Sequence, residues 1–264
     1  LAGRGRGRGS PLTDAREIRF PGRGRALVCA DPAAAARLCA ERFAEAARAA
    51  VEARGRFHVA LAGGGTPRLA YALLAQEPLA SAVPWHGVQF WWGDERCVPP
   101  GHPRSNFRMA REALLSHVPV PEAHVHRVQG ELGAARAADA YERELGEAWG
   151  GGVPRLDLVH LGMGGDGHTA SLFPFGPALL ERRRPAAPAL HEGEPRVTLT
   201  ATTLDSASRA EFLVTGADKA QRVRAALRGA LDPLRIPAQL VRPSAGEPVW
   251  ILDEASASRL EAPE

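Results

Sequence analysis

The chain has 264 residues, of which 45% are hydrophobic and 24% charged, so it can bury one large core as a soluble globular protein does. A net charge of +3 with only two tyrosines gives no basic, aromatic surface for nucleic acid, and no stretch of 18 apolar residues could cross a membrane. The three cysteines form no CxxC pair, which excludes a disulfide framework and a zinc site and predicts a reducing, cytoplasmic setting.

The N-terminal segment differs from the rest of the chain. Residues 1–15 begin with alternating glycine and arginine, a pattern that cannot bury apolar area and that predicts a disordered tail. From residue 16 to residue 264 we expect a single α/β domain. Its first elements are strands at 16–20 and 25–30, followed by a helix that begins at Asp31 and Pro32 and ends before Gly55.

A glycine loop follows the next strand. The apolar run at 57–62 leads directly into Gly63, Gly64, Gly65 and Thr66, where Thr66 is expected to cap the following helix. The free N–H groups of such a loop and the dipole of the helix favour an anion. The loop has neither a GxGxxG nor a GK[ST] pattern, so it indicates a phosphate or sugar phosphate more than a nucleotide. A plain tight turn is the alternative.

Three charged residues stand directly after the next apolar strand, VQFWW at 88–92. Asp94, Glu95 and Arg96 at such a place indicate a site at the same edge of the sheet, because charged side chains are rarely buried without a partner. A solvated loop is the alternative. The pattern then predicts a helix at 103–116, a short strand at 124–128 and a helix at 134–149.

The densest cluster of glycines follows a strand at 156–161. Four glycines fall between positions 162 and 167, where they let the backbone approach a ligand closely. Asp166 lies within this cluster and His168 directly after it, and Thr169 and Ser171 are expected to cap a short helix. A strand, a glycine turn and a helix start are typical of the ligand-binding edge of an open α/β sheet, whereas Asp-Gly-His alone is compatible with a simple turn.

The last third of the chain continues the alternation of strands and helices. Residues 181–195 are rich in proline and charge and predict a surface excursion. Lys219, the only lysine of the chain, opens a helix beyond a strand at 209–215. Further strands are expected at 196–200, which begins with Arg196, and at 238–241 and 248–252.

Repeated alternation of strand and helix with short turns predicts a mostly parallel sheet covered on both faces. The loops at 63–66, 94–96, 164–168 and 216–219 then meet at one edge of that sheet, because successive βαβ units share one handedness. An anion loop, acids, an arginine, a lysine and a histidine at one edge suit acid–base chemistry on a phosphorylated small molecule.

Six blocks of the sequence, from about residue 25 to the end, resemble the 6-phosphogluconolactonase family. They are LAGGGTP at 61–67, WGDERCVP at 92–99, SNFRM at 105–109, LGMGGDGHTASLFP at 161–174, RVTLT at 196–200 and VTGADK at 214–219. Gly65 departs from the family, which often has a serine there. Glucosamine-6-phosphate deaminase shares the fold, but its pattern has a glutamate where this chain has Phe173 and a tyrosine where it has Arg96.

The resemblance implies a fold of the sugar-phosphate isomerase/deaminase type, a Rossmann-like open sheet in a single α/β domain. It implies hydrolysis of 6-phospho-D-glucono-1,5-lactone to 6-phospho-D-gluconate in the pentose phosphate pathway, with His168 as general base assisted by Asp166 and Arg96. The implied substrate and phosphate contacts are Gly63, Gly64, Gly65, Thr66, Asp94, Arg196 and Lys219.

The resemblance implies no metal or other cofactor, and no partner besides the sugar-phosphate lactone. We expect a monomer or a weak homo-oligomer. The alternatives are a deaminase-like isomerase and a sugar-phosphate-binding module without catalysis. The presence of both Asp166 and His168 argues against the module.

Overall fold

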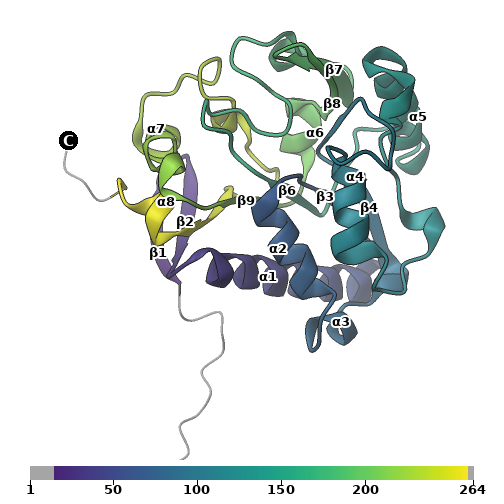
Figure 1. Cartoon of the computed structure of the whole chain (residues 1–264), viewed down its shortest axis with the longest axis horizontal. Coiled ribbons are helices and arrows are strands. Elements are labelled where there is room, and N and C mark those ends of the chain that lie inside the picture. Colours follow the sequence, from purple (N-terminus) through teal and green to yellow (C-terminus); the bar gives the residue numbers. More distant parts are fainter. Residues whose placement is uncertain (1–14, 261–264) are drawn as a thin grey trace, which may run out of the picture.

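A seven-stranded sheet runs through the computed structural model, which describes residues 15–260 (Figure 1). The predicted tail at 1–15 lies almost wholly outside the described residues. Neighbouring strands of the sheet are parallel except for the first pair, which is antiparallel. Their order is β1 (Arg16–Phe20), β2 (Gly24–Cys29), β10 (Val249–Asp253), β9 (Ala210–Val214), β6 (Leu158–Leu161), β3 (Phe57–Leu61) and β4 (Val88–Trp92).

The inner strands are apolar along almost their whole length. Every residue of β6, β9 and β10 is buried. Such strands are typical of a parallel sheet with covered faces, because neither face is left to water. The predicted α/β fold with a mostly parallel sheet is therefore confirmed.

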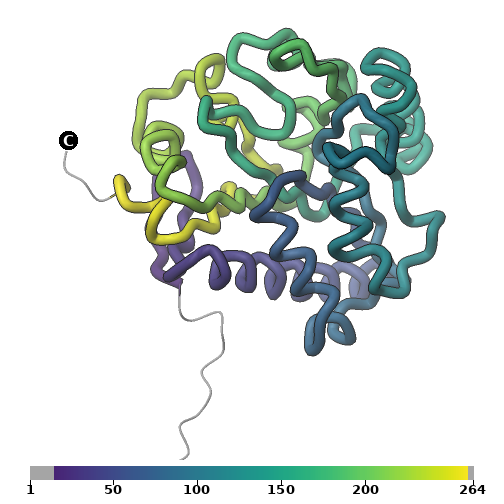
Figure 2. Tube along the Cα trace, viewed as in Figure 1, coloured from purple at the N-terminus to yellow at the C-terminus, as the bar shows by residue number. Residues whose placement is uncertain are grey.

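Helix α1 (Pro32–Arg54) packs against β2, β3 and β10 and covers one face of the sheet. The Asp31 carboxylate accepts a hydrogen bond of 2.8 Å from the backbone N–H of Ala34, and Gly55 ends the helix with a φ of 73°. Both predicted ends of this helix are confirmed. Figure 2 shows α1 along one side of the molecule, with both ends of the described chain near its start.

The remaining helices are shorter. Among residues 15–260 no helix is long and apolar enough to cross a membrane. The shorter helices are α2 (Gly65–Leu74), α3 (Leu79–Ala82), α4 (Asn106–Ala110), which continues as a π-helical turn (Arg111–Leu115), α5 (Ala134–Ala148), α6 (Ala201–Ser206), α7 (Ala220–Arg228) and α8 (Glu254–Ala257).

A second, antiparallel sheet consists of β5 (Asp94–Arg96), β8 (Glu194–Leu199) and β7 (Ala186–His191) and packs against α5. The predicted surface excursion at 181–195 was therefore wrong, because this segment holds one arm of a hairpin and the start of the other. Glu192 and Gly193 turn the hairpin with φ values of 48° and 78°. Two positive φ angles in a row are typical of a two-residue hairpin turn.

Three smaller predictions were also wrong. The expected strand at 124–128 is a 3₁₀ turn (Glu122–His124) followed by a single bridge from Val125 to Phe90. The expected strand at 238–241 is the 3₁₀ helix Pro237–Leu240. No helix begins at Thr169 or Ser171, because their hydroxyl groups donate to the Gly162 carbonyl and to the Asp94 carboxylate instead.

Candidate active site

The predicted loops meet at one edge of the large sheet. They follow β3, β4, β6 and β9, which are consecutive and parallel in the order β9-β6-β3-β4. The loops after β3, β4 and β6, together with Arg196 from the hairpin, enclose a cavity of about 210 Å³. A cavity at the carboxyl ends of parallel strands is the usual ligand site of an open α/β sheet.

His168 and Asp166 form a close pair at this cavity. The His168 Nδ1 atom lies 2.6 Å from Asp166 Oδ1, and the same oxygen accepts a hydrogen bond of 3.1 Å from the backbone N–H of His168. The carboxylate therefore favours the tautomer with the proton on Nδ1. The other ring nitrogen, Nε2, is then left able to accept a proton.

The environment of this pair holds the imidazole neutral. Burial lowers the pKa of His168, and the attraction of Asp166 only partly opposes this. Burial also disfavours the ionised form of Asp166, but the hydrogen bonds from His168, and its charge at a pH where the ring is protonated, outweigh burial and lower the pKa of Asp166. At neutral pH the pair is thus a neutral base beside a carboxylate.

Aromatic rings cover one side of the His168 ring. The Phe173 ring centroid lies 4.6 Å from that of His168, and the His191 ring stacks on Phe173 at 4.0 Å. Phe173 is buried, so it keeps water from this side of the imidazole. This contact contributes to the burial that lowers the pKa of His168.

Gly164 makes room for the pair. A Cβ atom at this position would lie 2.2 Å from both Cε1 and Nδ1 of His168 and 2.7 Å from Asp166 Oδ1. The backbone N–H of Gly164 also donates to the His168 carbonyl at 2.9 Å. The glycine is required here because of close packing against the imidazole.

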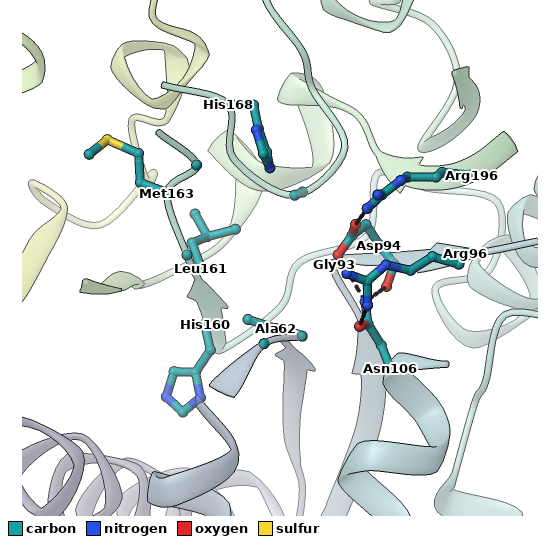
Figure 3. Close-up of a pocket in the computed structure, with 15 residues that line it drawn as sticks. Ala62, Gly93, Asp94, Arg96, Asn106, His160, Leu161, Met163, His168 and Arg196 are labelled. Carbon is teal, nitrogen blue, oxygen red and sulfur yellow. Dashed lines mark hydrogen bonds and ion pairs between the residues drawn. The ribbon is translucent and has the colours of Figure 1, made fainter. Parts of the chain in front are cut away.

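The opposite wall of the cavity holds a network centred on Asp94 (Figure 3). Asp94 Oδ2 accepts a hydrogen bond of 2.6 Å from the Ser171 hydroxyl, and Asp94 Oδ1 accepts one of 3.2 Å from Asn106 Nδ2. Arg96 donates to Asn106 Oδ1 rather than to Asp94, while Arg196 Nη1 lies 3.9 Å from Asp94 Oδ2. Asp94 thus joins the β5 segment to the loop after β6.

Glu95 supports the same wall from behind. It is 3% exposed, and its carboxylate accepts hydrogen bonds from the backbone N–H groups of Arg96, Asn106 and Phe107 and from the Ser105 hydroxyl. Burial raises the pKa of Glu95 despite these hydrogen bonds. It lies outside the lining of the cavity and fixes the start of α4.

The glycine loop differs in part from its prediction. Gly63 and Gly64 line the cavity, but helix α2 begins at Gly65 and has no side-chain cap. The predicted cap by Thr66 was wrong, because its hydroxyl lies 3.0 Å from that of Thr215. Lys219 is near the same edge, 3.4 Å from the Asp218 carboxylate, and does not line the cavity.

Within the described part of the chain, no group of three or more His, Cys, Asp and Glu side chains is placed to hold a metal ion. His160, which also borders the cavity, points its ring away from it toward α1 (Figure 3). Burial lowers the pKa of His160 to about 4.

Comparison with known proteins shows which family this chain belongs to. The profile of the family described as glucosamine-6-phosphate isomerases/6-phosphogluconolactonase matches residues 30–250. The chain belongs to this family. The match includes all four loops of the site.

Curated relatives within the family are similar over most of their length. A 6-phosphogluconolactonase of Synechocystis is 39% identical over 215 residues, which cover 80% of this chain and 88% of the relative. The human 6-phosphogluconolactonase is 38% identical over 240 residues, which cover 88% of this chain and 90% of the relative.

Solved structures of the family have the same fold. The 6-phosphogluconolactonase from Trypanosoma brucei is 30% identical, with a TM-score of 0.78 over 89% of this chain and 98% of that one. A monomeric glucosamine-6-phosphate deaminase has a TM-score of 0.73 over 89% of this chain and 99% of that one, but is 19% identical, so it shows a common fold alone.

The structure brings together most of the predicted site residues of this family member. His168, Arg96, Gly63, Gly64, Asp94 and Arg196 line the cavity, and Asp166 contacts His168. Gly65, Thr66 and Lys219 lie at the same edge but outside the lining. Sequence analysis missed Asn106 and Ser171. Asn106 stands within one of the matching blocks, but nothing in the sequence alone directs its side chain toward Asp94.

Proposed function

We propose that this protein hydrolyses 6-phospho-D-glucono-1,5-lactone to 6-phospho-D-gluconate, as a step of the pentose phosphate pathway, with His168 as general base. The observation that carries this proposal is the close pair of His168 and Asp166 at the cavity. The names of the curated relatives support the substrate. Lactone hydrolysis needs an activated water and no change of oxidation state.

In the proposed reaction, Nε2 of His168 takes a proton from a water molecule as the water oxygen bonds to the lactone carbonyl carbon. The bond between that carbon and the ring oxygen then breaks, and the protonated imidazole returns a proton to the leaving oxygen. Asp166 holds the ring in the productive tautomer and stabilises its protonated form. The products are a carboxylic acid and a free hydroxyl group.

Positive charge beside the cavity suits the anionic substrate. The cavity adjoins a groove of about 520 Å³ that is lined by Gly64 and Gly65 and by four arginines, with Glu194 as its one acidic residue. The arginines are Arg68, Arg96, Arg104 and Arg196. We propose that Arg96 faces the oxygen that becomes negative during water attack, since donors aimed at such an oxygen stabilise the transition state.

We propose that the phosphate lies against the glycine loop and Arg196. Gly63 and Gly64 lead directly into α2, and Gly65 and Thr66 are its first residues, where backbone N–H groups favour an anion. Lys219, in the turn after β9, would contribute its positive charge to binding of the phosphate. Asp94 would contact a sugar hydroxyl or keep the arginines in place.

The test compares wild type, His168→Ala and the uncatalysed reaction, followed as acid release at constant pH. We expect wild type to accelerate hydrolysis and the variant to lose about 10²- to 10⁴-fold of kcat, the usual contribution of a general base. His86→Ala, at an exposed histidine beyond the other end of β4, is the matched control and should retain full activity. Absence of acceleration by wild type would refute the proposal, and ammonia release from glucosamine 6-phosphate would then indicate a deaminase.

A further inference from the structure

One of the two arginines in the cavity has no carboxylate partner among the residues that the structure describes. Arg196 donates to Glu194 and lies 3.9 Å from Asp94. Arg96, by contrast, forms no ion pair with any residue of the described range 15–260, and its Nη1 atom donates only to Asn106 Oδ1 and to the Arg104 carbonyl. Its positive charge is therefore not neutralised by a neighbouring side chain.

The Asn106 amide links Arg96 to the carboxylate of Asp94. Its Nδ2 atom donates to the Asp94 carbonyl at 2.9 Å and to the Asp94 carboxylate at 3.2 Å, while its Oδ1 atom accepts from Arg96. Asn106 is 1% exposed. Only a group that donates at one end and accepts at the other satisfies a carboxylate and a guanidinium together.

Two neighbours hold the amide in this position. The backbone N–H of Asn106 donates to Glu95 Oε1 at 2.7 Å, which fixes the start of α4. On the other side, a Cβ atom at Gly63 would lie 1.9 Å from Asn106 Oδ1 and 2.4 Å from Cγ. The amide thus occupies the space that any larger residue at position 63 would need.

We propose that Asn106 is a positioning residue that keeps Arg96 apart from Asp94 and so leaves the charge of Arg96 available to the oxygen that becomes negative during water attack. The inference builds on the proposed function, but neither the relatives nor the predicted site residues assign Asn106 a role. Direct pairing of Arg96 with a carboxylate would neutralise that charge, because an opposite charge within about 4 Å dominates the local field.

The decisive variant is Asn106→Asp, which keeps the shape of the side chain and replaces its donor with a second acceptor. Ionised aspartate at this position would pair with Arg96 and repel Asp94. At pH 8 we expect kcat/KM to fall at least tenfold, mainly through a lower kcat, because Arg96 faces the oxygen that becomes negative during water attack. We also expect 6-phosphogluconate, which carries a carboxylate in place of the lactone carbonyl, to bind more weakly in calorimetry. A neutral, protonated aspartate again donates from one oxygen and accepts at the other, as the asparagine amide does, but with one donor hydrogen instead of two. The activity ratio of variant to wild type should therefore recover as the pH falls.

This pH readout separates positioning from a structural defect. The charged and titratable groups around position 106 are the same in both proteins, so their own titration largely cancels in the ratio. They are Arg68, Asp94, Glu95, Arg96, Arg104, Glu194, Arg196 and the pair of His168 and Asp166. Gln76→Glu, an exposed change of equal charge beyond the far end of α2, is the matched control and should have no effect. A loss in Asn106→Asp that does not vary with pH would overturn the proposal, as would wild-type activity.

Asn106→Ala keeps the proposal testable if the aspartate variant does not fold. It removes the spacer without adding a charge, so kcat/KM should fall with no recovery at low pH, and unchanged activity would overturn the proposal. If wild type itself does not hydrolyse the lactone, the proposed function fails. Calorimetry with 6-phosphogluconate then still decides the role of Asn106, because equal affinity in wild type and Asn106→Asp would refute it.

Discussion

Gly164→Ala tests whether the alignment of the imidazole limits the reaction. The added methyl carbon would lie 2.2 Å from the His168 ring, against about 3.4 Å for an ordinary contact, so the ring must retreat by roughly 1 Å. Displacement of a reacting group by about 1 Å can lower the rate about 10²-fold. We therefore expect kcat to fall by about that factor while KM changes little.

Gly165→Ala is a matched control from the same loop. A Cβ atom at this position would meet only the Lys219 Nζ atom, at 4.0 Å, and neither glycine has a positive φ. Both variants thus lose similar backbone freedom, but only one clashes with His168. Lactone hydrolysis above the uncatalysed rate and thermal unfolding should be measured for both.

Equal activity in the two glycine variants would refute this reasoning. It would mean that the loop shifts as a whole and carries the imidazole with it. Equal losses of thermal stability with unequal losses of kcat, by contrast, would show that the position of the His168 ring is what matters.

Two further predictions concern ionisable side chains that are largely buried, His168 and Glu211. Because burial lowers the pKa of His168, kcat/KM should stay constant as the pH falls to the usual histidine pKa of about 6.5. It should decline only as the pH falls through the lower pKa of this residue. A pH profile of kcat/KM with its acid midpoint above about 6.5 would contradict this prediction. Arg42→Ala leaves Glu211, which is 1% exposed, without its partner at 2.6 Å, so the free energy of unfolding measured in urea should fall by about 3–5 kcal/mol. Arg48→Ala, an exposed change on the same helix, should lower it by almost nothing.

The large sheet and its ligand edge could be predicted from sequence because their signals are local. Apolar runs such as VQFWW at 88–92 and LDLVHL at 156–161 are each followed at once by glycine or charge, which fixes both the strand and its end. Once the strands are parallel, their carboxyl ends must meet. The cavity at His168 follows from that geometry.

The strand predicted at 196–200 corresponds to most of β8, but β7 and its pairing with β8 were missed because prolines and charged residues disguise the strand pattern. Pro188 and Pro195 lie within these two strands, and charged residues surround the turn at 192–193. Proline is compatible with a strand where its missing N–H is not needed for pairing. The consequence for the site is direct, since β8 carries Arg196 and Glu194 to the cavity and groove.

Polar contacts across the cavity could not be predicted, because they depend on distances between segments far apart in the chain. Ser171 was expected to cap a helix and instead donates to Asp94, 77 positions earlier. Thr66 was likewise expected to cap α2 and instead faces Thr215. Hydroxyl groups have similar local options at a helix start and in a loop, so only the tertiary structure decides between them.

Phe173 distinguishes this chain from the deaminase pattern, and it also lies beside the His168 ring. By resemblance, the deaminase pattern has a glutamate at this position, where a carboxylate would lie beside the imidazole and raise the histidine pKa. Here the Phe173 ring lies 4.6 Å from His168, and burial lowers that pKa instead. A neutral imidazole with one free nitrogen suits the removal of a proton from water. Phe173 therefore places an aromatic ring where the deaminase pattern has an acid, and its contact with His168 contributes to the burial that lowers the pKa of that residue.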